Sequence, residues 1–184
     1  MGRTQENPMQ KMLMLLLTTT LIAVPAAQAG HHERGEKQAA IGIQIFDDGR
    51  SVPLVAGAQA NVALWQAYIE AHNDRDFEKI AAMNAENFEA IVPTGERVVG
   101  SEAQAAFLKA WIAESNPVWK VMYVVANDGE NTEGKMEEWL STGQMISSTD
   151  AEGNPMAEYH SIDVKLDAGK IQQVYVAAMQ VPAQ

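Results

Sequence analysis

The chain contains no cysteine among its 184 residues. Disulfide bonds, thiolate nucleophiles and cysteine-based zinc sites are therefore excluded. The absence leaves the redox compartment open, because a protein without cysteine tolerates oxidising surroundings without requiring them.

Positive charge is scarce as well. Lys and Arg together number 13 against 24 Asp and Glu, which gives a formal net charge of −11. Such a chain repels a phosphate backbone and an anionic membrane surface, so we expect no nucleic-acid partner. The acidic surface is interpreted as a solubilising one. The hydrophobic share of 47% suits the core of one globular domain with appendages.

Several catalytic motifs are also missing. The sequence has no Gly-rich phosphate loop, no HExxH and no G-x-S-x-G. Nucleotide hydrolysis, zinc proteolysis and serine hydrolysis therefore have no support, and no cofactor is predicted.

The N-terminus has the pattern of a signal peptide. Arg3 and Lys11 precede an apolar stretch over residues 12–24, Pro25 follows, and residues 27–29 read Ala-Gln-Ala, a small-x-small cleavage site. The stretch is too short for a comfortable transmembrane span. We expect residues 1–29 to be removed and the mature protein to be periplasmic or secreted, with no membrane contact after cleavage. An uncleaved membrane anchor is the alternative.

Cleavage after Ala29 would create a new N-terminus that reads Gly30-His31-His32. The α-amine, two deprotonated backbone amides and the His32 imidazole would supply four nitrogens in one plane. This arrangement suits Cu(II) or Ni(II) and not tetrahedral zinc. The alternative is that these histidines are surface residues that happen to lie beside a cleavage site.

Residues 30–57 are predicted to be a polar extension with a possible short hairpin. Residues 41–46 alternate loosely like an edge strand, and Asp47-Asp48-Gly49 is a turn signal. The main domain is expected to span residues 58–184.

Three helices are predicted in the main domain. Over residues 58–73, Trp65, Tyr68, Ile69 and His72 fall at i, i+3, i+4 and i+7, on one face. A second helix follows Asp76 as its cap.

The third helix is predicted to open at Ser101 as N-cap, with Gln104 completing a capping box, and to stop before Asn116-Pro117. After Pro117 the period changes to two. Strands are expected over residues 118–126, 135–147, 156–166 and 170–179, with a turn at Asn127-Asp128-Gly129. Short extended pieces are expected at 88–92 and 97–99. Three helices followed by an antiparallel meander predict an α+β fold.

Several local phrases resemble the NTF2-like superfamily, particularly its SnoaL-like and ketosteroid-isomerase-like branch. The phrases are WQAY at 65–68, AHNDRDF at 71–77, PTG at 93–95, VGSEA at 99–103, IDV at 162–164 and GKI at 169–171. They occur in the order of the family and cover roughly residues 58–180.

The resemblance implies a cone: three N-terminal helices packed on a curved antiparallel sheet that encloses a pocket. It also implies a function among ketosteroid isomerases, polyketide cyclases, hydratases and non-catalytic binding or dimerising modules. In catalytic relatives the strand after the Gly-Lys-Ile turn carries a His or Asp toward the pocket. Here the matching positions look like Val174 and Val176, so the usual acid/base pair is missing there.

His160 is the leading candidate for a catalytic residue. Strand alternation places it with Ile162 and Val164 on the inward face, where a histidine beside a carboxylate can act as a general base. The alternative is a core histidine satisfied by one hydrogen bond. Glu138, which alternates with Leu140, is expected to be the inward carboxylate, or else to lie at the rim in water.

A ligand-binding set is expected around the pocket mouth and floor, because aromatic side chains supply apolar contact and hydrogen-bond donors. The same residues could instead belong to the core. The set is Trp65, Tyr68, His72, Trp111, Tyr123 and His160.

Three functions remain open. The first is the binding of a small, largely apolar molecule by a homodimer. The second is an isomerase, cyclase or dehydratase that uses His160 and a pocket carboxylate. The third is a dimerisation module with a filled pocket. The volume of the pocket distinguishes the third from the first two.

Overall fold

The first strands of the structure form a hairpin that extends the main sheet. The computed structural model describes residues 38–182, so the expected signal peptide and the segment Gly30–His32 lie outside the described residues. Strand β1 (Ala40–Ile45) pairs with β2 (Ser51–Ala56) in antiparallel fashion, and β2 pairs in turn with β5 (Val118–Glu130). The hairpin expected in this region is therefore present.

Three helices follow the predicted periodicity. They are α1 (Gln59–Asp74), α2 (Phe77–Met83) and α3 (Ser101–Ser115). The face of α1 that carries Trp65, Tyr68 and His72 is buried, as expected from the i, i+3, i+7 spacing. Asp76 caps α2 by accepting a hydrogen bond from the Lys79 amide at 2.9 Å. None of the described helices is both long and apolar enough to cross a membrane.

The sheet has eight strands in the order β1-β2-β5-β6-β7-β8-β3-β4. The remaining strands are β3 (Asn84–Ile91), β4 (Arg97–Val99), β6 (Met136–Thr149), β7 (Pro155–Asp167) and β8 (Lys170–Val181). All neighbours are antiparallel except β3 and β8, which run parallel. Together with the helices this is an α+β fold.

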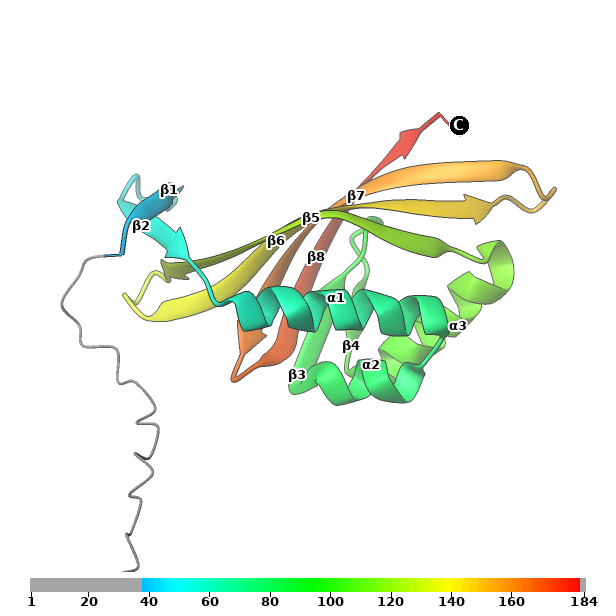
Figure 1. Ribbon diagram of the computed structural model, residues 1–184, viewed down its shortest axis with the longest axis horizontal. Coiled ribbons are helices and arrows are strands. Elements are labelled where there is room, and N and C mark those ends of the chain that lie inside the picture. The colour runs from blue at the N-terminus through cyan, green and yellow to red at the C-terminus, as the bar shows by residue number, and fades with distance from the viewer. Residues whose placement is uncertain (1–37, 183–184) are drawn as a thin grey trace, which may run out of the picture. The chain divides into compact units, whose positions relative to one another are not determined.

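The helices lie on one side of the sheet, as Figure 1 shows for α1 beneath the long strands β5 to β8. The core fills the space between these layers, because the strand residues that face the helices are apolar and buried. They include Leu140, Ile146, Ile162, Val164 and Ile171.

Three local expectations were wrong or not confirmed. The helices are not all N-terminal, because β1 and β2 precede α1 and because β3 and β4 separate α2 from α3. The N-cap of α3 is Gly100, and Ser101 makes no capping hydrogen bond. Ser101 Oγ instead accepts a hydrogen bond from Asn84 Nδ2 at 3.0 Å, so tertiary contact replaces the capping box.

The turn expected at Asn127-Asp128-Gly129 is also absent, because β5 runs straight through these residues to Glu130. Gly129 lies against side chains of the neighbouring hairpin. A Cβ on Gly129 would lie 2.6 Å from Leu54 Cδ2 and 2.8 Å from Gln44 Oε1. The glycine therefore serves close packing within the sheet rather than a turn.

A buried polar network joins α1, β3 and α3. The Tyr68 hydroxyl donates to Asn84 Oδ1 at 3.1 Å and accepts from Gln104 Nε2 at 2.5 Å. Asn84 Nδ2 donates to Gln104 Oε1 at 2.7 Å, which closes the triangle. Burial raises the pKa of the Tyr68 hydroxyl, and this effect outweighs the two hydrogen bonds, which lower it. The tyrosine therefore stays neutral and fixes the three elements to one another.

We predict that Tyr68→Phe lowers the free energy of unfolding by about 1–3 kcal/mol, because it leaves buried amide groups of Asn84 and Gln104 unpaired. Tyr175→Phe is the matched control. Its hydroxyl is on an exposed side chain and donates to Gln173 at 3.3 Å. Its loss should cost less than about 0.5 kcal/mol. Urea unfolding measures both variants. An equal decrease in the free energy of unfolding would show that the buried hydrogen-bond network stabilises the fold no more than an exposed hydrogen bond does.

Candidate functional site

A cavity of about 410 Å³ lies between the helices and the inner face of the sheet. Both layers contribute to it: the helices α1 and α3 on one side, and the strands β3 to β8 on the other. Most of its lining is apolar or aromatic. The lining includes Trp65, Tyr68, His72, Glu96, Trp111, Glu114, Trp119, Gln144, Glu158, His160, Val174 and Val176.

Aromatic rings form much of the wall. Trp111 of α3 meets Trp119 of β5 edge to face, with ring centroids 5.2 Å apart and planes at 89°. Trp65 and Tyr68 of α1 lie 5.4 Å apart, and His72 lies 5.5 Å from Trp119. Such tilted and edge contacts are the favourable arrangement of aromatic quadrupoles. They hold the walls of the cavity in fixed positions.

His160 lies in the cavity, where strand alternation places it. Its side chain is 6% exposed, and Nε2 lies 2.9 Å from Glu158 Oε2. The ring of Trp111 stacks over the imidazole, with the planes at 9° and the centroids 6.3 Å apart. Because a carboxylate only accepts, Nε2 carries a hydrogen, and in the tautomer with this one hydrogen Nδ1 keeps its lone pair. Among residues 38–182 no hydrogen bond to Nδ1 is formed.

Glu158 is the carboxylate partner that sequence reasoning missed. It precedes His160 by two positions on β7 and therefore shares its face. Gln180 Nε2 donates to its other carboxylate oxygen. The alternation that placed His160 inward could also have identified Glu158, because the same rule applies along the same strand.

Glu138 does not meet His160. It lies on the predicted face of β6 but is exposed, because it pairs with Leu166 near one end of the sheet whereas His160 pairs with Gln144. Its Oε2 accepts a hydrogen bond from Asn61 Nδ2 at 3.2 Å, near the start of α1. The expectation of a His160–Glu138 pair is corrected to His160–Glu158.

Tyr123 is also outside the cavity and is 46% exposed. A β-bulge explains the difference: Val121 pairs with Gln144, whereas Tyr123 pairs with Gly143. Met122 is thus an extra residue, and it shifts Tyr123 to the outer face. Simple alternation from Trp119 would have placed Tyr123 inward.

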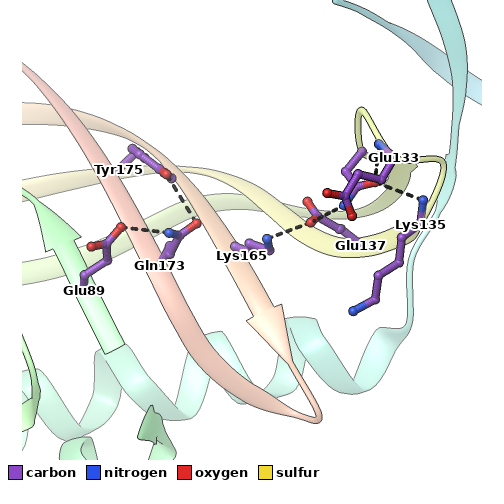
Figure 2. A network of polar contacts seen from close by, with 8 residues as sticks. Glu89, Glu133, Lys135, Glu137, Lys165, Gln173 and Tyr175 are labelled. Atoms are coloured by element: carbon purple, nitrogen blue, oxygen red, sulfur yellow. Dashed lines mark hydrogen bonds and ion pairs between the residues drawn. The ribbon is translucent and has the colours of Figure 1, made fainter. Parts of the chain in front are cut away.

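The outer face of the sheet carries ion pairs and hydrogen bonds donated by amide side chains (Figure 2). Glu137 Oε1 accepts from Lys165 Nζ at 2.7 Å and from Asn131 Nδ2 at 3.1 Å. Desolvation acts to raise the pKa of Glu137, but these hydrogen bonds outweigh it and hold the pKa below its usual value. On the neighbouring strands β8 and β3, Gln173 Nε2 donates a hydrogen bond to Glu89 Oε1 at 2.8 Å. These contacts are structural and face away from the cavity.

Gln144 is a second polar residue that sequence reasoning did not identify. It lies directly opposite His160 in the β6–β7 ladder and is 2% exposed. Its Oε1 has no hydrogen-bond partner among the described residues, and the same holds for Nε1 of Trp65. Buried polar atoms without partners are rare in folded proteins and costly, so these two atoms call for a partner from outside the described residues.

His72 is neutral at physiological pH. Burial lowers its pKa to about 4, against the hydrogen bond with the Tyr68 carbonyl at 2.8 Å, which raises it. The carbonyl can only accept, so Nδ1 donates and Nε2 is left as an acceptor. Within residues 38–182 no three His, Asp or Glu side chains gather as a metal site.

Comparison with solved structures identifies the fold. A proposed ketosteroid isomerase from Kribbella flavida matches with a TM-score of 0.55 and 17% identity over 70% of this chain and 84% of that one. A proposed polyketide cyclase from Xanthomonas campestris matches with a TM-score of 0.52 and 23% identity, over 65% of this chain and 90% of that one. An LEH-like epoxide hydrolase from M. tuberculosis matches with a TM-score of 0.51 and 13% identity, over 66% of this chain and 84% of that one.

No protein-family model matches the chain, and no curated protein matches it either. The structural neighbours are members of the NTF2-like superfamily, so the described residues have the NTF2-like fold. At the level of the fold, the resemblance stated from the sequence is confirmed.

We predict that His72 makes stability depend on pH. In the unfolded chain His72 binds a proton at about pH 6.5, whereas in the folded protein it does so only near pH 4. As the pH falls through this interval, the unfolded state is favoured by up to about 3 kcal/mol. His72→Asn keeps a donor near the carbonyl but cannot titrate.

The advantage of the wild type over His72→Asn, from urea unfolding at several pH values, should therefore shrink between pH 6.5 and 4. Taking the difference cancels the carboxylates that titrate in both proteins. A difference that stays constant over this range would contradict the prediction.

Proposed function

We propose that this protein binds a small, largely apolar molecule in its cavity. The observation that carries the proposal is the cavity itself: about 410 Å³, within the range of small-molecule sites, and lined mainly by aromatic and aliphatic side chains. A few polar groups, those of Gln144, Glu158 and His160, lie together on β6 and β7. This combination of an apolar wall and a few convergent polar groups is typical of a binding pocket.

The names of the structural neighbours support this proposal. A ketosteroid isomerase and a polyketide cyclase are named for small organic substrates. The likeness to them lies in the fold, whereas the side chains of its own cavity determine what this chain binds.

We predict that Val176→Phe, which adds volume inside the cavity, weakens the binding of 2-naphthalenemethanol at least tenfold. Val176 is half-buried and lines the cavity on β8. Val99→Phe makes the same change at a side chain that is 61% exposed and outside the cavity, and should leave binding unchanged. Isothermal titration calorimetry measures both. Equal affinity of all three proteins would remove the cavity as the binding site.

A second candidate function is acid/base catalysis, favoured by the 2.9 Å contact between His160 and Glu158. Glu158 holds the Nε2–H and thereby orients the ring, so that Nδ1 can remove a proton from a bound molecule. Proton removal beside a carbonyl would leave an enolate on the substrate and a proton on Nδ1, which returns it to another carbon or to the same one. His160 is the catalytic residue and Glu158 the positioning residue.

We predict that the protein catalyses exchange of the α-hydrogens of 2-tetralone in D₂O, followed by proton NMR. His160→Gln should reduce the exchange rate by about 10²-fold or more, the usual contribution of a general base. Glu158→Gln keeps a hydrogen-bond partner for Nε2 and should lose less. An exchange rate equal to that of buffer would leave binding as the function.

We further propose that two copies associate through the outer face of the sheet. Around Tyr123 this face carries Val125 and Met179, which are 46% and 60% exposed. Tyr159 packs over Gly143 beside Tyr123 on the same face. A second copy would bury these side chains. Sedimentation equilibrium should give twice the chain mass, and a Tyr123→Glu variant should give the chain mass.

Export is proposed on the N-terminal pattern alone. The pattern consists of Arg3 and Lys11, the apolar stretch, and the small-x-small site at residues 27–29. Removal of this signal peptide would make Gly30 the first residue of the mature protein. Sequencing the N-terminus of the mature protein tests this, and a start before residue 20 would overturn it. The Cu(II) or Ni(II) site at Gly30–His32 depends on that cleavage.

A further inference from the structure

The charge of the cavity lining is one-sided. Three carboxylates line it, on Glu96, Glu114 and Glu158, and none of its described lining residues is Lys or Arg. Glu114 lies in the last turn of α3, where the unpaired helix carbonyls add negative potential. The Arg75 guanidinium lies over the ring of Trp119, with its carbon 5.4 Å from the ring centroid, but Arg75 is not among the lining residues. The three carboxylates leave the lining itself net negative, which attracts a positive group and repels an anion.

The hydrogen-bonding groups of the cavity are mostly acceptors. Gln144 Oε1 is buried without a partner. The carboxylates only accept, and neutral His72 leaves Nε2 as an acceptor. The donors of the lining are fewer: they include the buried, unpaired Nε1 of Trp65, the indole N–H groups of Trp111 and Trp119, and Nε2 of Gln144. The wall therefore matches a ligand that brings more N–H or O–H groups than acceptors.

The acceptors converge on one part of the sheet. Gln144 is directly opposite His160 across the β6–β7 ladder, and Glu158 is two positions further on the same face, the diagonal neighbour of Gln144. Diagonal neighbours on one face lie about 7–8 Å apart at their backbones, within the joint reach of a Gln and a Glu side chain. One cationic head group could therefore contact both.

The aromatic wall is favourable for the same ligand. The indole of Trp111 stacks over His160, next to Glu158, and meets Trp119 edge to face. Ring faces of Trp attract organic cations, and the attraction increases in a site that excludes water.

We infer that the cavity selects a positively charged ligand, a small amine with an aromatic or aliphatic body. Its ammonium group donates to Gln144 Oε1 and Glu158, and its apolar body lies among Trp65, Trp111 and Trp119. Glu96 and Glu114 raise the local concentration of cations at the cavity. This assignment rests on the proposed function, because it names the class of ligand for the same cavity.

Three probes with one ring system test the inference: 2-naphthylmethylamine, which is protonated at pH 7, neutral 2-naphthalenemethanol and anionic 2-naphthoate. Calorimetry should show the amine binding about fivefold or more tightly than the alcohol, and naphthoate more weakly than the alcohol. Raising the salt to 1 M should reduce the advantage of the amine, because exposed Glu96 and Glu114 are then screened.

Substitutions locate the source of the selectivity. Glu114→Gln and Glu158→Gln should each lower the ratio of amine to alcohol affinity by about twofold or more, with little effect on the alcohol. Glu133→Gln is the matched control, since Glu133 is an exposed carboxylate in the β5–β6 turn, outside the cavity. It should leave the ratio unchanged.

The outcomes separate the two proposals. If the alcohol or naphthoate binds as tightly as the amine, or if Glu133→Gln changes the ratio as much as Glu158→Gln, the charge selectivity is overturned and the cavity remains a binding site. If the wild type binds none of the three probes, the proposed function fails and the inference fails with it.

Discussion

The hydroxyl of Tyr68 is the point on which the walls of the cavity depend. It belongs to α1, donates to Asn84 of β3 and accepts from Gln104 of α3. These three elements form one side of the cavity, and apolar packing alone would allow them to slide. A closed and buried hydrogen-bond triangle has a single satisfied geometry, so it sets the distance between the helices and β3. A cavity can persist beside it because the surrounding elements cannot collapse inward.

The opposite wall obtains its chemistry from strand alternation. On β7 the positions that face the helices are apolar except for Glu158 and His160, and on β6 the facing residue is Gln144. The polar group is thus carried by two rigid central strands rather than by loops. This arrangement can serve acid/base chemistry and recognition of a donor-rich ligand at once.

Helical periodicity and strand alternation determine how much of the site could be predicted from the sequence. The α1 face and the inward direction of His160 were predictable, because both depend on a local period that burial enforces. Tyr123 was misplaced because one bulged residue, Met122, reverses alternation, and nothing in the composition marks it. Glu138 was given the correct face, yet it lies beyond the part of β6 that the cavity covers. Only the register between strands reveals that distance, and pairing over long separations is not encoded locally.

The open cavity also bears on the choice between a binding protein and a dimerisation module with a filled pocket. A chain that needed only its outer sheet face could fill the interior with larger apolar side chains and gain stability. Here Val174 and Val176 occupy wall positions, and Gln144 and Trp65 keep buried polar atoms without partners. A buried polar atom left without any partner costs about 1–3 kcal/mol, so a water molecule or a ligand group is expected to pair with each of them. A ligand that pairs with them removes this cost and so stabilises the fold by mass action. The cavity is therefore better explained by an occupant than by packing.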